Sequence, residues 1–417
     1  MVRCWAFSLR IVLLSAILSA LLCFCFVPVN AATFVNPIVK TGQDPWVIYH
    51  EGYYYYVWAG GDRIFVNKAM RLQDIGAVAQ VTVWKSPAGT IYSQHTYAPE
   101  LHNLDGRWYI YFAADDGNTD NHRMFVIEGN SQDPQGSYTF KGQLKPVTDR
   151  RAIDGTVLVT DKGQKYFIWS GWATSSPPRP YRNNLYIAQM SNPWTLVGDR
   201  YLLSTATYDW ESVSYEGNMI YVNEGPEVLK KNNKIHIIYS ASAATSETYC
   251  LGQLTYASGD FVDAMSWVKK QTPVFSKTAD VYGPGHCSFT KSPDGTEDWI
   301  VYHSKKNREW NYDRQVSAQK FTWNPNDEPV FGSPIAPGIP IQEPSDARAS
   351  TTTATATRSG QSAATTTSFI SSSAVSPVAT NTLESYGIYI GVAILAVVLV
   401  PLVVLRKMKA KSSTIRG

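Results

Sequence analysis

One pattern recurs five times in this chain and limits the folds that it can adopt. Each copy has a small polar entry, a short run rich in Val, Ile, Tyr and Trp, a turn, and a second, more aromatic run. The copies begin 54, 56, 70 and 61 residues apart, at Asp44, Ala98, Asp154, Glu224 and Gly285. Such runs are typical of β-strands. Because repeats of this length with four strands each characterise β-propellers, the sequence predicts an all-β, five-bladed β-propeller.

The two ends of the chain carry signals for the secretory pathway and the membrane. Residues 1–31 combine a basic start, an apolar stretch and a small-residue site, as in a cleaved signal peptide; an uncleaved signal anchor is the alternative. Residues 387–405 carry no charge and are nearly long enough to cross a bilayer as a transmembrane helix. The basic residues 406–417 that follow should remain cytoplasmic.

The segment between the repeats and the apolar stretch is rich in Ser and Thr. Residues 345–383 are too polar to bury a core, and they predict a disordered, O-glycosylated stalk. Residues 33–344 remain as the propeller domain. We therefore expect a single-pass type I membrane protein whose body lies at the cell surface or outside the cell. Whether the stalk is cleaved to release that body stays open.

Composition excludes two other classes of protein. Only Cys250 and Cys287 of the five cysteines fall within the propeller domain, so a disulfide scaffold is excluded, although one bridge between them stays open. The net charge of +3 owes much to the basic tail, so no nucleic-acid partner is expected. The aromatic content of 13% suits cross-strand packing, sugar stacking or both. We expect a monomer.

Polar side chains stand at the entry of each repeat. In a propeller the first strand of every blade lines the central axis, so these residues should converge at one end of it; they are Asp44, Glu100, Asp154, Glu224 and His286. Converging carboxyls perturb one another's pKa values. Glycoside hydrolysis needs one carboxylic acid for the leaving oxygen and one carboxylate for water or the anomeric carbon. A third carboxylate can keep the acid protonated.

The motifs QDPWV, AIDGTV and NEGPEV, together with YAPEL and GPGHCSF, resemble those of glycoside hydrolase family 43. The resemblance covers residues 36 to 341 and implies a five-bladed β-propeller that hydrolyses arabinose- or xylose-containing plant polysaccharides with inversion. It makes Asp44 the general base, Glu224 the general acid and Asp154 the residue that modulates the pKa of the acid. Tyr97 departs from the family's more common Trp, which leaves sugar stacking at this position open.

The resemblance also extends to two residues of the last repeat. His286 resembles a histidine near the propeller axis, where members often hold a structural calcium ion with water, although the chemistry itself requires no cofactor. Arg314 resembles an arginine that reaches the sugar hydroxyls. Calcium prefers oxygen ligands, so one imidazole would act through water.

The positions of three further residues also predict their roles. Trp46 follows Asp44 on the same strand face, so it lines the sugar pocket or packs within the blade. Glu100 is expected to bind sugar, water or a neighbouring strand. Glu227, three residues after Glu224, should be hydrogen-bonded between blades or partly solvated.

Within the family, TVWKSP, HTYAPELH and YFAADDG resemble the exo-acting arabinofuranosidases, so the resemblance implies an inverting, exo-acting α-L-arabinofuranosidase. Its substrate would be a plant cell-wall polysaccharide, arabinan or arabinoxylan, or an arabino-oligosaccharide. A β-xylosidase or an endo-arabinanase of the same family is one alternative. A non-catalytic, membrane-tethered carbohydrate-binding propeller is another.

Overall fold

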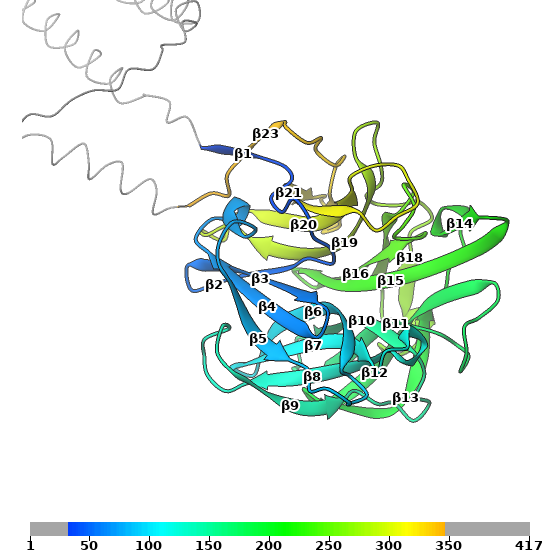
Figure 1. Ribbon diagram of the computed structural model, residues 1–417. Coiled ribbons are helices and arrows are strands. Elements are labelled where there is room, and N and C mark those ends of the chain that lie inside the picture. The colour runs from blue at the N-terminus through cyan, green and yellow to red at the C-terminus, as the bar shows by residue number, and fades with distance from the viewer. Residues whose placement is uncertain (1–31, 347–417) are drawn as a thin grey trace, which may run out of the picture. The chain divides into compact units, whose positions relative to one another are not determined.

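A computed structural model describes residues 32–346, and Figure 1 shows their arrangement. Within this range the chain is built from β-strands and four short 3₁₀-helices, which confirms the predicted all-β class. The 3₁₀-helices are η1 (Leu72–Asp74), η2 (Thr119–Asn121), η3 (Asp209–Glu211) and η4 (Ala264–Ser266). None of the helices in residues 32–346 is long and apolar enough to span a membrane.

Twenty strands form five consecutive antiparallel units of four strands, which we call blades 1 to 5. Blade 1 contains β2 (Trp46–His50), β3 (Tyr53–Gly60), β4 (Arg63–Ala69) and β5 (Gln80–Lys85). Blade 2 contains β6 (Gln94–Leu104), β7 (Arg107–Asp115), β8 (Arg123–Gly129) and β9 (Tyr138–Gln143). Blade 3 contains β10 (Ala152–Val159), β11 (Lys165–Gly171), β12 (Tyr181–Asn192) and β13 (Thr195–Ser204). Blade 4 contains β15 (Asn218–Lys231), β16 (Lys234–Ala241), β17 (Cys250–Tyr256) and β18 (Trp267–Lys269). Blade 5 contains β19 (Tyr282–Lys291), β20 (Asp298–Lys305), β21 (Arg314–Trp323) and β22 (Pro329–Val330).

The first strands of the five blades form a closed ring. Strand β2 contacts β6, β6 contacts β10, β10 contacts β15, β15 contacts β19, and β19 contacts β2 again. Each of the five predicted repeats supplies the first two strands of one blade. The ring therefore places all five repeat entries around one axis, as the repeat pattern predicted.

Large apolar side chains fill the spaces between neighbouring blades. Between blades 5 and 1, for example, Tyr54 and Tyr56 of β3 pack with Trp299 of β20 and Val316 of β21 in one buried cluster. Strand alternation places these side chains on one face of each sheet, which the next blade then covers. Blades 3 and 4 are also joined directly, because β12 and β15 pair in parallel. Strand β14 (Ser212–Tyr215) adds to the β15 edge of this joint sheet.

The two ends of the described chain meet at blade 5. Strand β1 (Thr33–Val35) pairs with β23 (Pro340–Gln342), and the two lie side by side in Figure 1. Residues 38–42 then run along β21 through backbone hydrogen bonds to Val316 and Arg314. This pairing delivers the following residue, Gln43, and then Asp44 to the axis.

Several predicted features fall outside the described residues. These are the signal peptide, nearly all of the stalk, the transmembrane helix and the cytoplasmic tail, and they stay predictions. The question of a disulfide can be answered, because Cys250 and Cys287 are both buried free thiols.

Candidate active site

Besides His95 of β6 and Gly283 of β19, which also have a positive φ, each blade presents a residue with a positive φ where its first strand reaches the site. These residues are Asp44, Ala98, Asp154, Gly225 and His286, with φ between 41° and 53°. In blades 2 to 5 the pairing of the first two strands shifts register at this point, as in a β-bulge. The bulge changes the direction in which the local side chains point. The residues with a positive φ therefore mark the equivalent positions of the five blades.

This register corrects the predicted alignment of the repeat entries. Asp44, Asp154 and His286 do occupy equivalent positions, as expected. Glu224 does not, because it comes one residue before the positive-φ residue of blade 4. Glu100 lies two residues after that of blade 2, which makes it equivalent to Glu227. The prediction that all five entries share one position was therefore wrong for these two glutamates.

Asp44 lies among three basic side chains of blade 5. Its Oδ1 is 3.3 Å from Nδ1 of His286, 3.3 Å from Nδ1 of His303 and 3.4 Å from Nη1 of Arg314. Burial alone would raise the pKa of Asp44, but His286, Arg314 and His303 more than offset it and hold the pKa far below its usual range. Asp44 is therefore a carboxylate at any working pH.

His303 fixes the backbone of Asp44 as well as its charge. The backbone N–H of Asp44 donates to Nδ1 of His303 over 3.1 Å. Burial and the Arg314 charge lower the pKa of His303 to about 3, against the opposing effect of Asp44, so the ring is neutral and can accept this hydrogen bond.

Asp154 and Glu224 are linked through the backbone of blade 4. The N–H of Gly225 donates to Oδ2 of Asp154 over 3.2 Å, and Gly225 directly follows Glu224. Burial raises the pKa of Asp154 to about 7; the charges of Glu224 and Asp44 add to this shift, while His286 opposes it. The two carboxyls therefore interact, and the charge of Glu224 helps Asp154 to keep its proton.

Glu224 is partly exposed, as Asp44 is, and two neighbours orient it. Tyr249 donates its hydroxyl to Oε1 over 2.9 Å, and Nδ2 of Asn183 donates to Oε2 over 3.2 Å. Burial raises the pKa of Glu224, although Tyr249, His286 and Asn183 work against this shift by favouring the charged form. The net result is a carboxyl that retains its proton more readily than an ordinary glutamate.

His286 lies between the carboxyls. Its backbone N–H donates to Oγ of Ser240 over 2.8 Å. Burial would lower the pKa of His286, but the charges of Asp44, Asp154 and Glu224 raise it overall. A protonated His286 therefore balances part of the negative charge at the axis.

The predicted calcium ion has no direct ligand set among the described residues. In residues 32–346, no three His, Cys, Asp or Glu side chains are arranged to hold a metal ion. Because the imidazole of His286 faces Asp44, these side chains do not fit a directly bound metal. An ion held only through water stays a prediction.

Glu100 lies in a buried layer that also contains Glu227. Oε2 of Glu100 is 2.8 Å from Nε2 of His102, and its carboxyl is hydrogen-bonded to that of Glu227. Burial, then the Glu100 charge, raise the pKa of Glu227 well above its usual value. This interblade pair matches the expected role of Glu227. A substrate contact by Glu100 stays a prediction, and its two buried partners do not favour it.

Trp46 packs against blade 2. Its indole N–H donates to the carbonyl of Leu101 over 2.8 Å, and its ring lies 4.5 Å from that of His102. Of the two roles considered for Trp46, these contacts favour packing between blades over a wall of the sugar pocket. Arg314, by contrast, touches Asp44 directly, so the predicted sugar-binding role is compatible with its position.

The sequence analysis missed His303, Tyr249 and Asn183. His303 lies on β20 and Asn183 on β12, and Tyr249 directly precedes β17, so none of them belongs to the first strands that carry the repeat pattern. His303 could have been found from strand pairing, because it lies opposite Gly285, next to His286. Nothing comparable in the sequence marks Asn183 or Tyr249.

The site thus combines a permanently ionised carboxylate with a second carboxyl that retains a proton. When the pKa values of two carboxyls differ in this way, the ionised one can act as the general base and the protonated one as the general acid. Two carboxyls with these properties are what glycoside hydrolysis requires.

Comparison with known proteins agrees with this chemistry. Residues 34–329 match the model of the glycosyl hydrolases family 43. An extracellular exo-α-(1→5)-L-arabinofuranosidase of Streptomyces avermitilis is 38% identical over 74% of this chain and 65% of its own length, a little under two thirds. An α-L-arabinofuranosidase 43 of Humicola insolens is 36% identical over 78% of this chain and 68% of its own.

A solved structure gives the same result. The crystal structure of an α-L-arabinofuranosidase from Lactobacillus brevis superposes with a TM-score of 0.66 at 35% identity, over 73% of this chain and 98% of that one. The family model covers more than half of the chain, and the fold and the carboxyl site are those expected of its members. The chain belongs to family 43 of the glycosyl hydrolases.

Proposed function

We propose that this protein is an exo-acting α-L-arabinofuranosidase that removes arabinose from arabinan or arabinoxylan with inversion of configuration. The names of its relatives from Streptomyces avermitilis, Humicola insolens and Lactobacillus brevis support the sugar specificity. The pKa of Asp44 is lowered and that of Glu224 is raised, and these opposite shifts support Asp44 as the general base and Glu224 as the general acid. Two relatives are named as extracellular enzymes, which supports an extracellular location for this body.

In this mechanism one sugar–oxygen bond breaks as another forms. The carboxylate of Asp44 takes a proton from water, whose oxygen attacks the anomeric carbon. Glu224 gives its proton to the departing oxygen, so that the leaving alcohol is neutral. Asp154 raises the proton affinity of its neighbour by its negative charge. Inversion requires about 6.5–9.5 Å between the two reacting carboxyls, which leaves space for the water.

The test compares the parent protein with Asp44→Asn and Glu224→Gln variants on nitrophenyl α-L-arabinofuranoside. We expect release of nitrophenol by the parent and a loss of at least about a hundredfold with Asp44→Asn, as for removal of a general base. Glu51→Gln is the matched control, since Glu51 is an exposed carboxyl in the turn after β2. No release by the parent would favour a carbohydrate-binding propeller instead. Release of nitrophenol from the β-D-xyloside alone would favour a β-xylosidase.

A further inference from the structure

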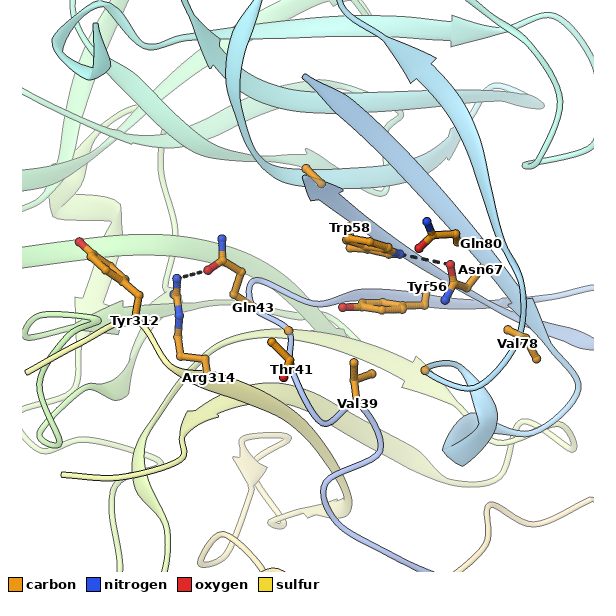
Figure 2. Close-up of a pocket in the computed structure, with 13 residues that line it drawn as sticks. Val39, Thr41, Gln43, Tyr56, Trp58, Asn67, Val78, Gln80, Tyr312 and Arg314 are labelled. Atoms are coloured by element: carbon orange, nitrogen blue, oxygen red, sulfur yellow. Dashed lines mark hydrogen bonds between the residues drawn. The ribbon is translucent and has the colours of Figure 1, made fainter. Parts of the chain in front are cut away.

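A cavity of about 560 Å³ extends from Arg314 outward between blades 1 and 5 (Figure 2). Side chains of β3, β4 and β5 line it on one side, and Tyr312 and Arg314 line it on the other. Its size lies within the range of about 300–1,000 Å³ that is typical of small-molecule sites. None of the three carboxyls of the active site lines this cavity, so it lies beside them.

Trp58 gives the cavity a fixed aromatic wall. One face of its indole stacks on Phe65, with ring centres 4.4 Å apart and planes 22° from parallel. The indole N–H donates to Oδ1 of Asn67 over 3.2 Å, and Asn67 is itself held by the carbonyl of Ile75. The indole is therefore oriented before any ligand arrives, and part of its surface remains open to the cavity.

Amide side chains stand on either side of this aromatic wall. Figure 2 shows the rings of Trp58 and Tyr56 between Gln43 and Gln80. Oε1 of Gln43 accepts a hydrogen bond from Arg314, while Gln80 is exposed. A pentose has a face of C–H groups and a rim of hydroxyls, so it matches an aromatic wall flanked by planar amides.

The cavity is continuous with the active site through two residues. Arg314 lines the cavity and also contacts Asp44 at 3.4 Å. Tyr56 lines it too, and burial, then the charge of Asp44, raises the pKa of its hydroxyl. A sugar in the cavity would therefore adjoin the sugar that is cleaved.

We propose that this cavity is a second sugar subsite, which binds another pentose residue of the same substrate chain. The inference rests on the proposed arabinofuranosidase function and deepens it. An enzyme with such a subsite prefers oligosaccharides to single-sugar aryl glycosides. The aromatic wall formed by Trp58 supplies most of this preference.

The experiment compares kcat/KM for α-(1→5)-arabinotriose with kcat/KM for nitrophenyl α-L-arabinofuranoside, in the parent and in a Trp58→Ala variant. We expect the ratio of the two to fall about tenfold in Trp58→Ala, which corresponds to about 1.4 kcal/mol. A Trp58→Phe variant, which keeps an aromatic ring, should restore most of the ratio. Trp194→Ala is the matched control, because Trp194 is a half-buried indole in the turn between β12 and β13.

An unchanged ratio in Trp58→Ala, or an equal fall in Trp194→Ala, would overturn the subsite. Binding of arabinotriose by calorimetry, measured with Glu224→Gln and with Glu224→Gln combined with Trp58→Ala, separates this result from failure of the proposed function. If the parent hydrolyses neither substrate, the function fails. Weaker binding by the double variant would then still support the subsite, and equal binding or none would overturn it.

Discussion

The carboxylate of Asp154 accepts a hydrogen bond from the backbone N–H of Gly225, the residue that directly follows Glu224. This bond joins blade 3 to blade 4 and holds two carboxyls close together in a buried site. Because each charge opposes ionisation of the other, Asp154 can influence the proton on Glu224 without touching the substrate. The same bond also depends on a glycine backbone with φ of +50°.

The first prediction concerns the alkaline limb of the pH–rate profile, where the enzyme loses the proton of its acid. Asp154→Asn removes a negative charge near Glu224, so the pKa of Glu224 should fall and the limb should move to lower pH by about one unit. Tyr249→Phe removes a hydrogen bond that favours the charged form of Glu224, so the limb should move to higher pH. The measurement is kcat against pH on nitrophenyl α-L-arabinofuranoside.

Because Asp154→Asn and Tyr249→Phe should move the alkaline limb in opposite directions, each variant serves as a control for the other. Tyr302→Phe serves as the matched tyrosine variant, because Tyr302 is equally buried but bonds to Gln319. If Asp154→Asn and Tyr249→Phe moved the limb in the same direction, Glu224 would not be the group that titrates there.

A second prediction is that Gly225→Ala lowers the activity by more than its loss of folding stability can explain. A Cβ at this position would lie 3.1 Å from Nδ1 of His286, and φ of +50° strains any residue with a side chain. We expect a loss of about 1–3 kcal/mol in the free energy of unfolding and a clear fall in kcat. Gly106→Ala, at φ of +77° with open space around it, should show the strain alone. Equal activity of the two variants would contradict the proposed role of the Gly225 backbone.

A third prediction concerns the buried pair of Glu100 and Glu227. A carboxyl whose pKa is raised on folding keeps its proton while the unfolded chain loses it. The fold therefore loses stability as pH rises above the ordinary carboxyl pKa. Glu227→Gln retains a donor for Glu100 but cannot titrate. At pH 8 it should raise the free energy of unfolding by at least about 1.4 kcal/mol, the value of one pKa unit.

Chemical denaturation at pH 5 and pH 8 tests this prediction. The advantage of Glu227→Gln over the parent should shrink at pH 5, close to the ordinary carboxyl pKa, because there the unfolded parent chain also keeps part of its proton at Glu227. Glu227→Ala is the contrasting variant, since it leaves Glu100 without this partner and should cost about 1–3 kcal/mol. A loss of stability in Glu227→Gln at both pH values would show that the pair is not protonated.

Much of the fold and the identity of the three carboxyls could be predicted from the sequence. The repeat length and strand patterns predicted the blades, and the motifs pointed to Asp44, Asp154 and Glu224. The offsets of Glu224 and Glu100 could not be predicted, because the bulge residues differ chemically and only their positive φ unites them. His303 and Tyr249 were missed for a related reason. Neither lies in a first strand: Tyr249 directly precedes β17 and nothing in the sequence marks it, whereas His303 shows itself only when β20 is paired with β19.

A fourth prediction is stereochemical. If water attacks from the side of Asp44 while Glu224 assists departure, the first product of an α-arabinofuranoside is β-L-arabinofuranose. Proton NMR during the first minutes of hydrolysis distinguishes the two anomers before they equilibrate. An α-anomer that forms first would indicate retention and would require a covalent intermediate instead of an attacking water.

The central claim is that Glu224 donates the proton, and the leaving-group dependence of a Glu224→Ala variant tests it most directly. A dinitrophenolate departs without protonation, whereas the sugar alcohol of arabinotriose needs a proton. We predict that Glu224→Ala loses at least about a hundredfold in kcat/KM on arabinotriose but less than about tenfold on dinitrophenyl α-L-arabinofuranoside. An equal loss on both substrates would contradict the assignment of Glu224 as the general acid.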